Sequence, residues 1–296
     1  MDKTTLRLSF QMNDSGSKSK KRNVTPRAIE FDFSDLTDLL FFDNNRLKTS
    51  FILGLSAAIP HAEDLIIEKM RLYRDRITDA ELLDDMRGII GQEAHHSRVH
   101  AAFNNKAKEL GSDVPGITEI TNNRMRKSIG KLSEKEQLAL AVCYEHITAL
   151  FGNVFAKNPE VLEGLKGSAH ELMSWHAMEE IEHKSVCFDV YMAIFNDRKC
   201  IKKMAHKAYY NAMTNIHYGM FLDLKSSKTM PKMKDISGFL HFLFSKKGIV
   251  RASFKDSLKI YSNNFDPREI DNTEFVNKWV SENSELIQRT KKASAP

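Results

Sequence analysis

Two stretches of the sequence decide the fold, Gln92-Glu-Ala-His-His96 and Trp175-His-Ala-Met-Glu-Glu-Ile-Glu-His-Lys184. Each contains a Glu-x-x-His motif in a helix-forming context. Residues three apart project from the same face of a helix, so each motif places a carboxylate and an imidazole where they can bind one metal ion. A single copy occurs often by chance, so the surrounding sequence must show whether the two copies belong to one site.

The surrounding sequence has helical hydrophobic spacing and clear helix-start signals. Apolar residues recur every three or four positions from Lys48 to Arg76, and capping boxes begin at Thr78, Ser133 and Ser168. We therefore expect four long helices within residues 47–195, the first of them bent or irregular at Pro60. No alternation typical of strands competes, so the expected class is all-α. Further helices, shorter and more basic, are expected at 199–224, 236–246, 248–262 and 273–290.

Four carboxylates lie near the middle of the four long helices. Glu93 is 15 residues after Thr78, and Glu63 is 15 residues before it. Glu145 and Glu180 are each 12 residues after the capping serine of their own helix. At 1.5 Å per residue, all four fall within about 5 Å of one height along a bundle axis.

The spacing of these carboxylates also fits one topology. Intervals of 30 and 35 residues suit two helical hairpins, and the 52 residues between them leave about 105–132 as a long crossover. Two hairpins with one crossover describe a ferritin-like four-helix bundle, in which di-iron and di-manganese proteins use a Glu from two helices and Glu-x-x-His from the other two. The candidate ligands are Glu63, Glu93, His96, Glu145, Glu180 and His183. A lone mid-helix Glu or His is usually a surface residue, but six at one depth argue against that reading.

These strings resemble a known family. Together with Cys187-Phe-Asp-Val-Tyr191 and Asn264-Phe-Asp-Pro267, they resemble a bacterial family of predicted metal-dependent hydrolases over about residues 25–270. The ligand order is also similar to that of p-aminobenzoate N-oxygenase, a ferritin-like di-iron enzyme whose fourth ligand helix carries His-x-x-x-Glu-x-x-His. That resemblance implies a third imidazole ligand at His176. Helix geometry agrees, because residues 176, 180, 183 and 187 share one face.

The sequence leaves the roles of three neighbouring residues open. His100 shares the face of Glu93 and His96, so it could be a further ligand, a group that supports a ligand, or a core histidine. Glu179 could orient an imidazole or be a solvated charge at the helix edge. Cys187 could line a substrate pocket, although a small buried hydrophobic residue is the commoner role.

Composition limits the setting and the partners. The chain has 296 residues, a net charge of +5 with dispersed basic residues, three cysteines and no long uncharged apolar stretch. Nucleic acid is therefore an unlikely partner, a disulfide framework is excluded, and a cytoplasmic location is expected. We expect a flexible basic arm at 1–28, a metal-binding domain at 29–270 with its four-helix core at about 47–195 and packed helices at 199–262, and a C-terminal helix and tail at 271–296.

The C-terminal third interleaves basic and aromatic residues. Within 199–262 this pattern is most typical of a core-facing stripe with a solvated opposite face. Peripheral contact with an anionic membrane, or a homodimer surface, is the alternative.

The combined pattern predicts a dinuclear metal enzyme, with two divalent ions, Fe favoured over Mn or Zn. The leading hypothesis is an O₂-dependent oxygenase that acts on a small organic substrate, apolar by one reading, and takes electrons from an electron donor. The alternative is a hydrolase in which the same two ions activate water. A third reading is a non-enzymatic helical module that binds a membrane or a partner.

Overall fold

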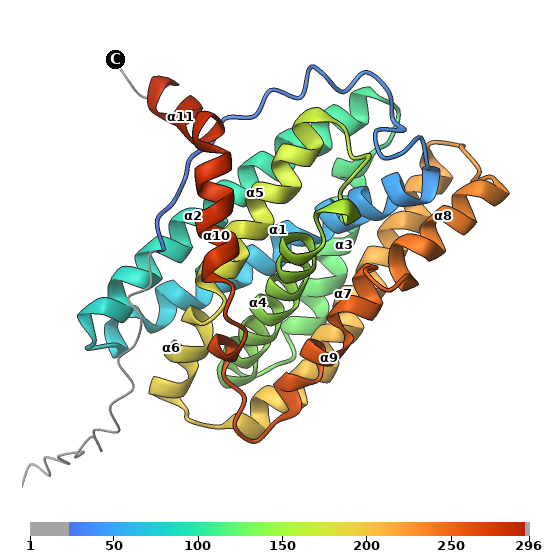
Figure 1. Cartoon of the computed structure of the whole chain (residues 1–296). Helices are drawn as coiled ribbons and strands as arrows, with labels where there is room; N and C mark the ends of the chain where they lie inside the picture. Colours follow the sequence, from blue (N-terminus) through green and yellow to red (C-terminus); the bar gives the residue numbers. More distant parts are fainter. Residues whose placement is uncertain (1–23, 294–296) are drawn as a thin grey trace, which may run out of the picture.

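The computed structural model describes residues 24–293, with side chains described to residue 288, and this part of the chain is all-α (Figure 1). The expected class is confirmed: the described residues contain no strand, only an isolated bridge between Phe42 and Leu165. The α-helices are α1 (Arg46–Tyr73), α2 (Ala80–Glu109), α3 (Val114–Ile129), α4 (Glu134–Lys157), α5 (Gly167–His183), α6 (Val186–Ile194), α7 (Arg198–Ser226), α8 (Met233–Phe244), α9 (Ile249–Ser257), α10 (Thr273–Glu282) and α11 (Ser284–Ala293). Short 3₁₀ turns follow α1, α4 and α9, and a fourth precedes α10; they are η1 (Arg74–Arg76), η2 (Pro159–Val161), η3 (Lys259–Tyr261) and η4 (Pro267–Glu269).

The buried apolar side chains form two clusters, one on either side of a polar band. On α1, residues 51–57 belong to the first cluster and residues 65–73 to the second, with Glu63 between them. On α2 the order is reversed, with 82–89 in the second cluster and 99–107 in the first, on either side of Glu93 and His96. The candidate metal site therefore lies at the centre of the fold, where side chains pack against their neighbours on all sides.

A fifth long helix belongs to this core, which differs from the expected four-helix arrangement. Helix α7 has 29 residues and packs along α1 as closely as α2 does. The two backbones approach at glycines: a Cβ on Gly54 would lie 2.6 Å from the carbonyl oxygen of Ile216, and one on Gly219 would lie 3.0 Å from Gly54 Cα. The helix expected at 199–224 is present and packed, but it is as long as the other core helices, and its place in the core could not be expected because the close approach at glycines is a tertiary feature. The crossover expected at 105–132 contains α3, which packs on α1 and α7.

One of the three expected capping boxes is present in the structure, and the other two helices begin with a different cap. Ser133 forms the predicted capping box with Glu136. Helix α2 is instead capped by Asp79, one residue after Thr78. Helix α5 begins at Gly167, and the Ser168 amide and hydroxyl both donate to Asp35 from the N-terminal segment. A carboxylate distant in sequence thus takes the place of a local cap.

Pro60 is accommodated within a continuous α1. Proline lacks an N–H, so the carbonyl of Ser56, four residues earlier, loses its helical partner. That carbonyl accepts a hydrogen bond from Asn104 Nδ2 of α2 at 3.4 Å. The helix consequently runs on to Tyr73.

The last of the long helices expected within residues 47–195, which starts near Ser168, is interrupted directly after His183. A turn at residues 184–185 separates α5 from α6, and Cys187 lies in the first turn of α6. Cys187 is fully buried in the second apolar cluster, and burial raises its thiol pKa well above the usual range. It packs as a small hydrophobic residue.

Two helical segments are long and apolar enough to cross a membrane. They are the segment Arg46–Arg76 and α4, whose most apolar windows are 61% and 89% buried inside the fold. Such burial is typical of the core helices of a soluble protein.

Candidate metal centre

The structure brings all seven predicted ligands into one buried band. Helix α1 contributes Glu63, α2 contributes Glu93 and His96, α4 contributes Glu145, and α5 contributes His176, Glu180 and His183. None of these residues is more than 5% exposed. Burying so many ionisable groups is costly unless they are paired or bind metal, so the cluster requires an explanation.

Six of the seven residues present donor atoms to one another at metal-binding separations. The atoms of Glu93, His96, Glu180 and His183 lie within 4.8 Å of one another, and those of Glu63, His96 and His176 form a second group, of three residues, within the same limit. His96 Nδ1 lies 3.5 Å from Glu93 Oε2 and 3.7 Å from Glu180 Oε1. His176 Nε2 lies 2.7 Å from Glu180 Oε1 and 3.8 Å from Glu63 Oε1. The two groups overlap at His96, and Glu180 Oε1 lies close to both His96 and His176.

Five of the seven predicted ligands carry buried atoms that have no hydrogen-bond partner among the described residues. These atoms are Glu63 Oε1, both carboxylate oxygens of Glu93, His96 Nδ1, Glu145 Oε1 and His183 Nε2. Buried polar atoms without partners are rare because each forfeits its hydration. Four of these five residues, Glu63, Glu93, His96 and His183, belong to the donor groups above, which is an arrangement that divalent cations would satisfy, so the residues present fit a metal site.

The outward-facing atoms of the same side chains, by contrast, are held by hydrogen bonds. Glu179 accepts from His96 Nε2 at 3.1 Å, and Glu145 accepts from His183 Nδ1 at 2.8 Å. Ser97 Oγ donates to Glu63 at 2.5 Å. A carboxylate behind an imidazole fixes the ring and directs its other nitrogen to the metal.

Glu145 differs from the other predicted ligands. Its Oε2 is engaged by His183, and it is absent from both groups of converging donors. Its Oε1 has no partner. The structure therefore places Glu145 behind His183, and its direct binding to metal stays a prediction that rests on Oε1.

His100 lies behind His176, where it sets the orientation of that ring. His100 Nε2 is 2.6 Å from His176 Nδ1, and His100 Nδ1 is 2.8 Å from Ser56 Oγ. The Ser56 hydroxyl donates to Asn104 Oδ1 at 2.6 Å, so it must accept from His100 Nδ1. A neutral His100 then accepts from His176 Nδ1–H, which leaves the lone pair on His176 Nε2 facing the cluster. His100 is absent from the donor groups, so its geometry is that of a supporting residue.

The N-terminal segment closes the outer side of the site, which sequence reasoning missed. Arg27 donates to Glu179 at 3.1 Å and to both oxygens of Glu182 at 2.7 and 2.6 Å. The segment approaches α2 so closely that a Cβ on Gly88 would lie 2.2 Å from the Val24 carbonyl oxygen. We call residues 24–27 the N-terminal strap. The glycines at 88 and 91, three apart on α2, were the one sequence signal of a close approach there.

The cluster holds protons in the absence of metal. Burial raises the pKa of Glu63 well above its usual range and that of Glu145 to about 8. Burial lowers the pKa of His183, but the charges of Glu145 and Glu180 outweigh it and raise the pKa to about 10. Metal binding must displace such protons, so the affinity of the site should fall as the pH decreases.

The fold and the site together define a class: an all-α protein with a buried cluster of carboxylates and imidazoles suited to divalent metal ions. A family model described as predicted metal-dependent hydrolase matches residues 25–271. The chain therefore belongs to the family of predicted metal-dependent hydrolases. No curated protein and no solved structure gives a significant match, so the resemblance to p-aminobenzoate N-oxygenase gains no support from these comparisons.

Proposed function

We propose that this protein is a metal-dependent hydrolase whose active centre is a pair of divalent ions held by Glu63, Glu93, His96, His176, Glu180 and His183. The observation that carries the proposal is the set of unpartnered buried atoms that converge from α1, α2 and α5. Family membership supports hydrolysis as the reaction. When bound, two such ions supply Lewis-acid activation of water and of the bond to be cleaved.

The protein's own residues orient the ligands and exclude bulk water. Glu179, His100 and Glu145 each fix one imidazole through its outward nitrogen. Trp175 packs its edge against the His96 ring, with centroids 4.8 Å apart, and is itself fully buried. A dry site strengthens every electrostatic interaction within it, which favours binding of divalent cations by carboxylates.

A second candidate is O₂-dependent oxidation at the same ions. One observation favours it: the donors are carboxylates and imidazoles without a thiolate, and they include a Glu-x-x-His pair on each of α2 and α5, as in di-iron and di-manganese bundles. Oxidation by O₂ would require iron at the site. Hydrolysis could use either Mn or Zn.

A comparison of reconstituted proteins tests the proposal. Metal-free full-length protein is reloaded anaerobically with Zn²⁺, Mn²⁺ or Fe²⁺ and assayed against chromogenic esters, phosphoesters and amides, and for O₂ uptake. The proposal expects metal-dependent hydrolysis that is lost in Glu93→Gln and retained in Glu81→Gln, an exposed carboxylate on the same helix. Hydrolysis that survives Glu93→Gln refutes it, and O₂ uptake by the Fe²⁺ protein without hydrolysis supports the second candidate.

A further inference from the structure

Three consecutive helices each expose an apolar stripe. The exposed residues recur at intervals of three, four or eight positions, which places them on one face of each helix. They are Tyr210, Met213 and Phe221 on α7, Met233, Ile236, Leu240 and Phe244 on α8, Val250 and Phe254 on α9, and Leu258 directly after α9, with exposures of 38–81%. Met230, in the α7–α8 loop, is 79% exposed. We call these residues the apolar face.

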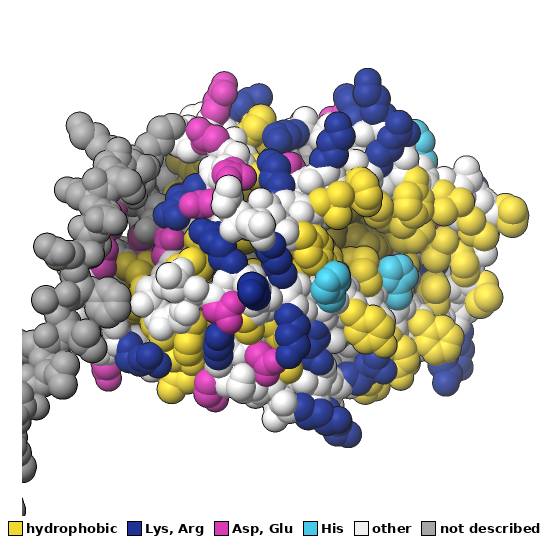
Figure 2. Space-filling view, turned by 90° about the horizontal axis from the view of Figure 1, so that it is seen from below, with side chains coloured by type: hydrophobic (Ala, Val, Ile, Leu, Met, Phe, Trp, Pro, Cys, Tyr) yellow, Lys and Arg dark blue, Asp and Glu magenta, His cyan; other side chains and the backbone are white. Residues whose placement is uncertain are grey.

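The residues of the apolar face are different from the residues that the same helices pack against the core. Helix α7 already buries Ile201, Met204, Ala208 and Ile216 in the two clusters, and α8 buries Phe242. A core-facing stripe therefore exists, as the sequence predicted, but it does not account for the exposed one. Figure 2 shows hydrophobic side chains gathered around a hollow at one end of the molecule. Contiguous exposed apolar surface of this kind marks an interaction site.

The charge around the apolar face is almost entirely positive. Residues 210–258, which span the apolar face, contain eight Lys and Arg and three acidic residues, of which Asp223 is fully buried and Asp256 pairs with Lys259. The third acidic residue is Asp235. Asp235 is 3% exposed and accepts from the Lys232 amide at the start of α8, so it offers no negative charge at the surface. Of the eight basic side chains, only Lys247 forms an ion pair with another described residue, Glu160.

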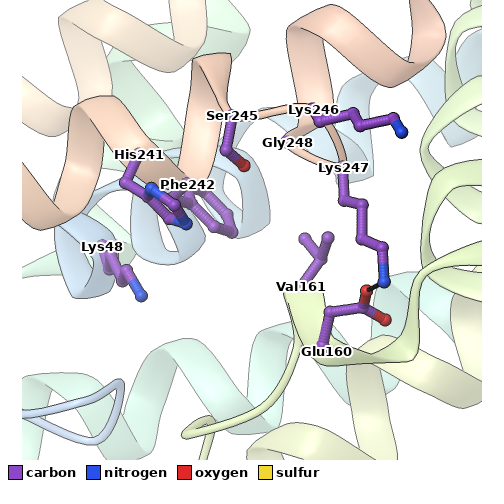
Figure 3. Close-up of a pocket in the computed structure, with 9 residues that line it drawn as sticks. All are labelled: Lys48, Glu160, Val161, His241, Phe242, Ser245, Lys246, Lys247 and Gly248. Atoms are coloured by element: carbon purple, nitrogen blue, oxygen red, sulfur yellow. Dashed lines mark ion pairs between the residues drawn. The ribbon is translucent and has the colours of Figure 1, made fainter.

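A cavity of about 320 Å³ adjoins the end of α8. Its lining includes Lys48, which pairs with Asp43, and also His241 and Lys246, with Phe242 at its wall. Figure 3 shows Lys48 and His241 near each other at the open space, while Lys247 turns toward Glu160. Lys246, which forms no ion pair with another described residue, thus adds a positive charge at a concave site next to the apolar face.

We propose that the apolar face binds the surface of an anionic phospholipid membrane. Amphipathic helices with exposed aromatic and aliphatic side chains and flanking lysines insert their apolar side among lipid headgroups, and the lysines contact phosphate. Charge distinguishes a membrane from a second copy of the chain as the binding partner. A second copy that bound through the same face would bring eight more basic residues against it. An acidic lipid surface complements both the apolar and the positive features.

Co-sedimentation of the full-length protein with vesicles tests the proposal. The protein is expected to bind phosphatidylcholine vesicles that contain phosphatidylglycerol, to bind pure phosphatidylcholine weakly, and to be released by salt. Leu240→Ser with Phe254→Ser, and Lys228→Glu with Lys234→Glu, should each reduce binding about tenfold or more. The matched controls are Leu72→Ser, which is 51% exposed on α1, and Lys131→Glu, and both should bind normally.

Three results would overturn the proposal. The first is equal binding to neutral and anionic vesicles, or none. The second is vesicle binding that depends on another part of the chain: the variants of the apolar face still bind, and binding is lost when the basic run Lys18–Arg22, which lies outside the described residues, is neutralised in the full chain. The third is a dimer in sedimentation equilibrium that Leu240→Ser dissociates, without vesicle binding, which would make the face a contact between copies. All the substituted residues that the structure describes are exposed, so we expect every variant to fold. Unchanged melting curves would show that it does.

Discussion

Replacing Arg27 by Gln should weaken metal binding, although Arg27 touches no predicted ligand. Its guanidinium holds Glu179 and Glu182, and Glu179 accepts the hydrogen bond from His96. The Glu179 side chain is 1% exposed, so loss of Arg27 leaves a buried carboxylate with one partner fewer and the His96 ring less firmly placed. Loss of such outer support typically costs about 10–100-fold in metal affinity. At about 1.4 kcal/mol per tenfold change, the expected loss is about 1.4–2.8 kcal/mol.

Competition with a chromophoric chelator at neutral pH measures this loss. Arg27→Lys should be intermediate, because lysine keeps the charge but not the forked geometry. The matched control is Arg87→Gln on α2, an exposed arginine that pairs with Asp84. Equal affinities for wild type and Arg27→Gln, or an equal loss in Arg87→Gln, would refute the coupling of the N-terminal strap to the metal site.

Three further changes follow from the same structure. His100→Phe keeps a ring in place but removes the bond to His176, so one of the two ions should bind about 10–100-fold more weakly while the other is retained, as measured by titration calorimetry. Lys203 and the Ser133 cap lower the pKa of Glu136 to about 2. The stabilisation of the fold by ionised Glu136 is therefore present above pH about 4.5 and lost as the pH falls toward 2. The difference in free energy of unfolding between wild type and Glu136→Gln, about 0.5–1 kcal/mol in urea unfolding, should therefore narrow below pH 4.5. Arg46→Met strands the buried Asp223, 2.7 Å from Arg46, and should cost about 3–5 kcal/mol, much of it recovered when Asp223→Leu is added.

The position of the metal site could be predicted from sequence because a helix has a fixed rise. Glu63, Glu93, Glu145 and Glu180 lie at similar distances from helix boundaries, and this places them at one height whatever the details of packing. Boundary errors of one residue, as at Thr78, do not disturb that argument. The convergence of donor atoms in the structure is consistent with it.

Features that depend on segments distant in sequence could not be predicted. Asp35 caps α5 from 133 residues away, and Arg27 reaches Glu179 across 152 residues. The core position of α7 depends on Gly54 meeting Gly219, which no local pattern reveals. The roles of Glu145 and His100 likewise depended on which nitrogen of each histidine faces inward, a property of side-chain geometry and not of spacing.

Metal analysis tests the central claim most directly. Full-length protein is prepared anaerobically, reloaded with divalent metal, freed of loosely bound ions and analysed for metal per chain, beside Glu93→Gln and Glu81→Gln. The account predicts about two ions per chain in wild type and in Glu81→Gln, and a clear loss in Glu93→Gln. Fewer than about one ion per chain in wild type, with no change in Glu93→Gln, would contradict it.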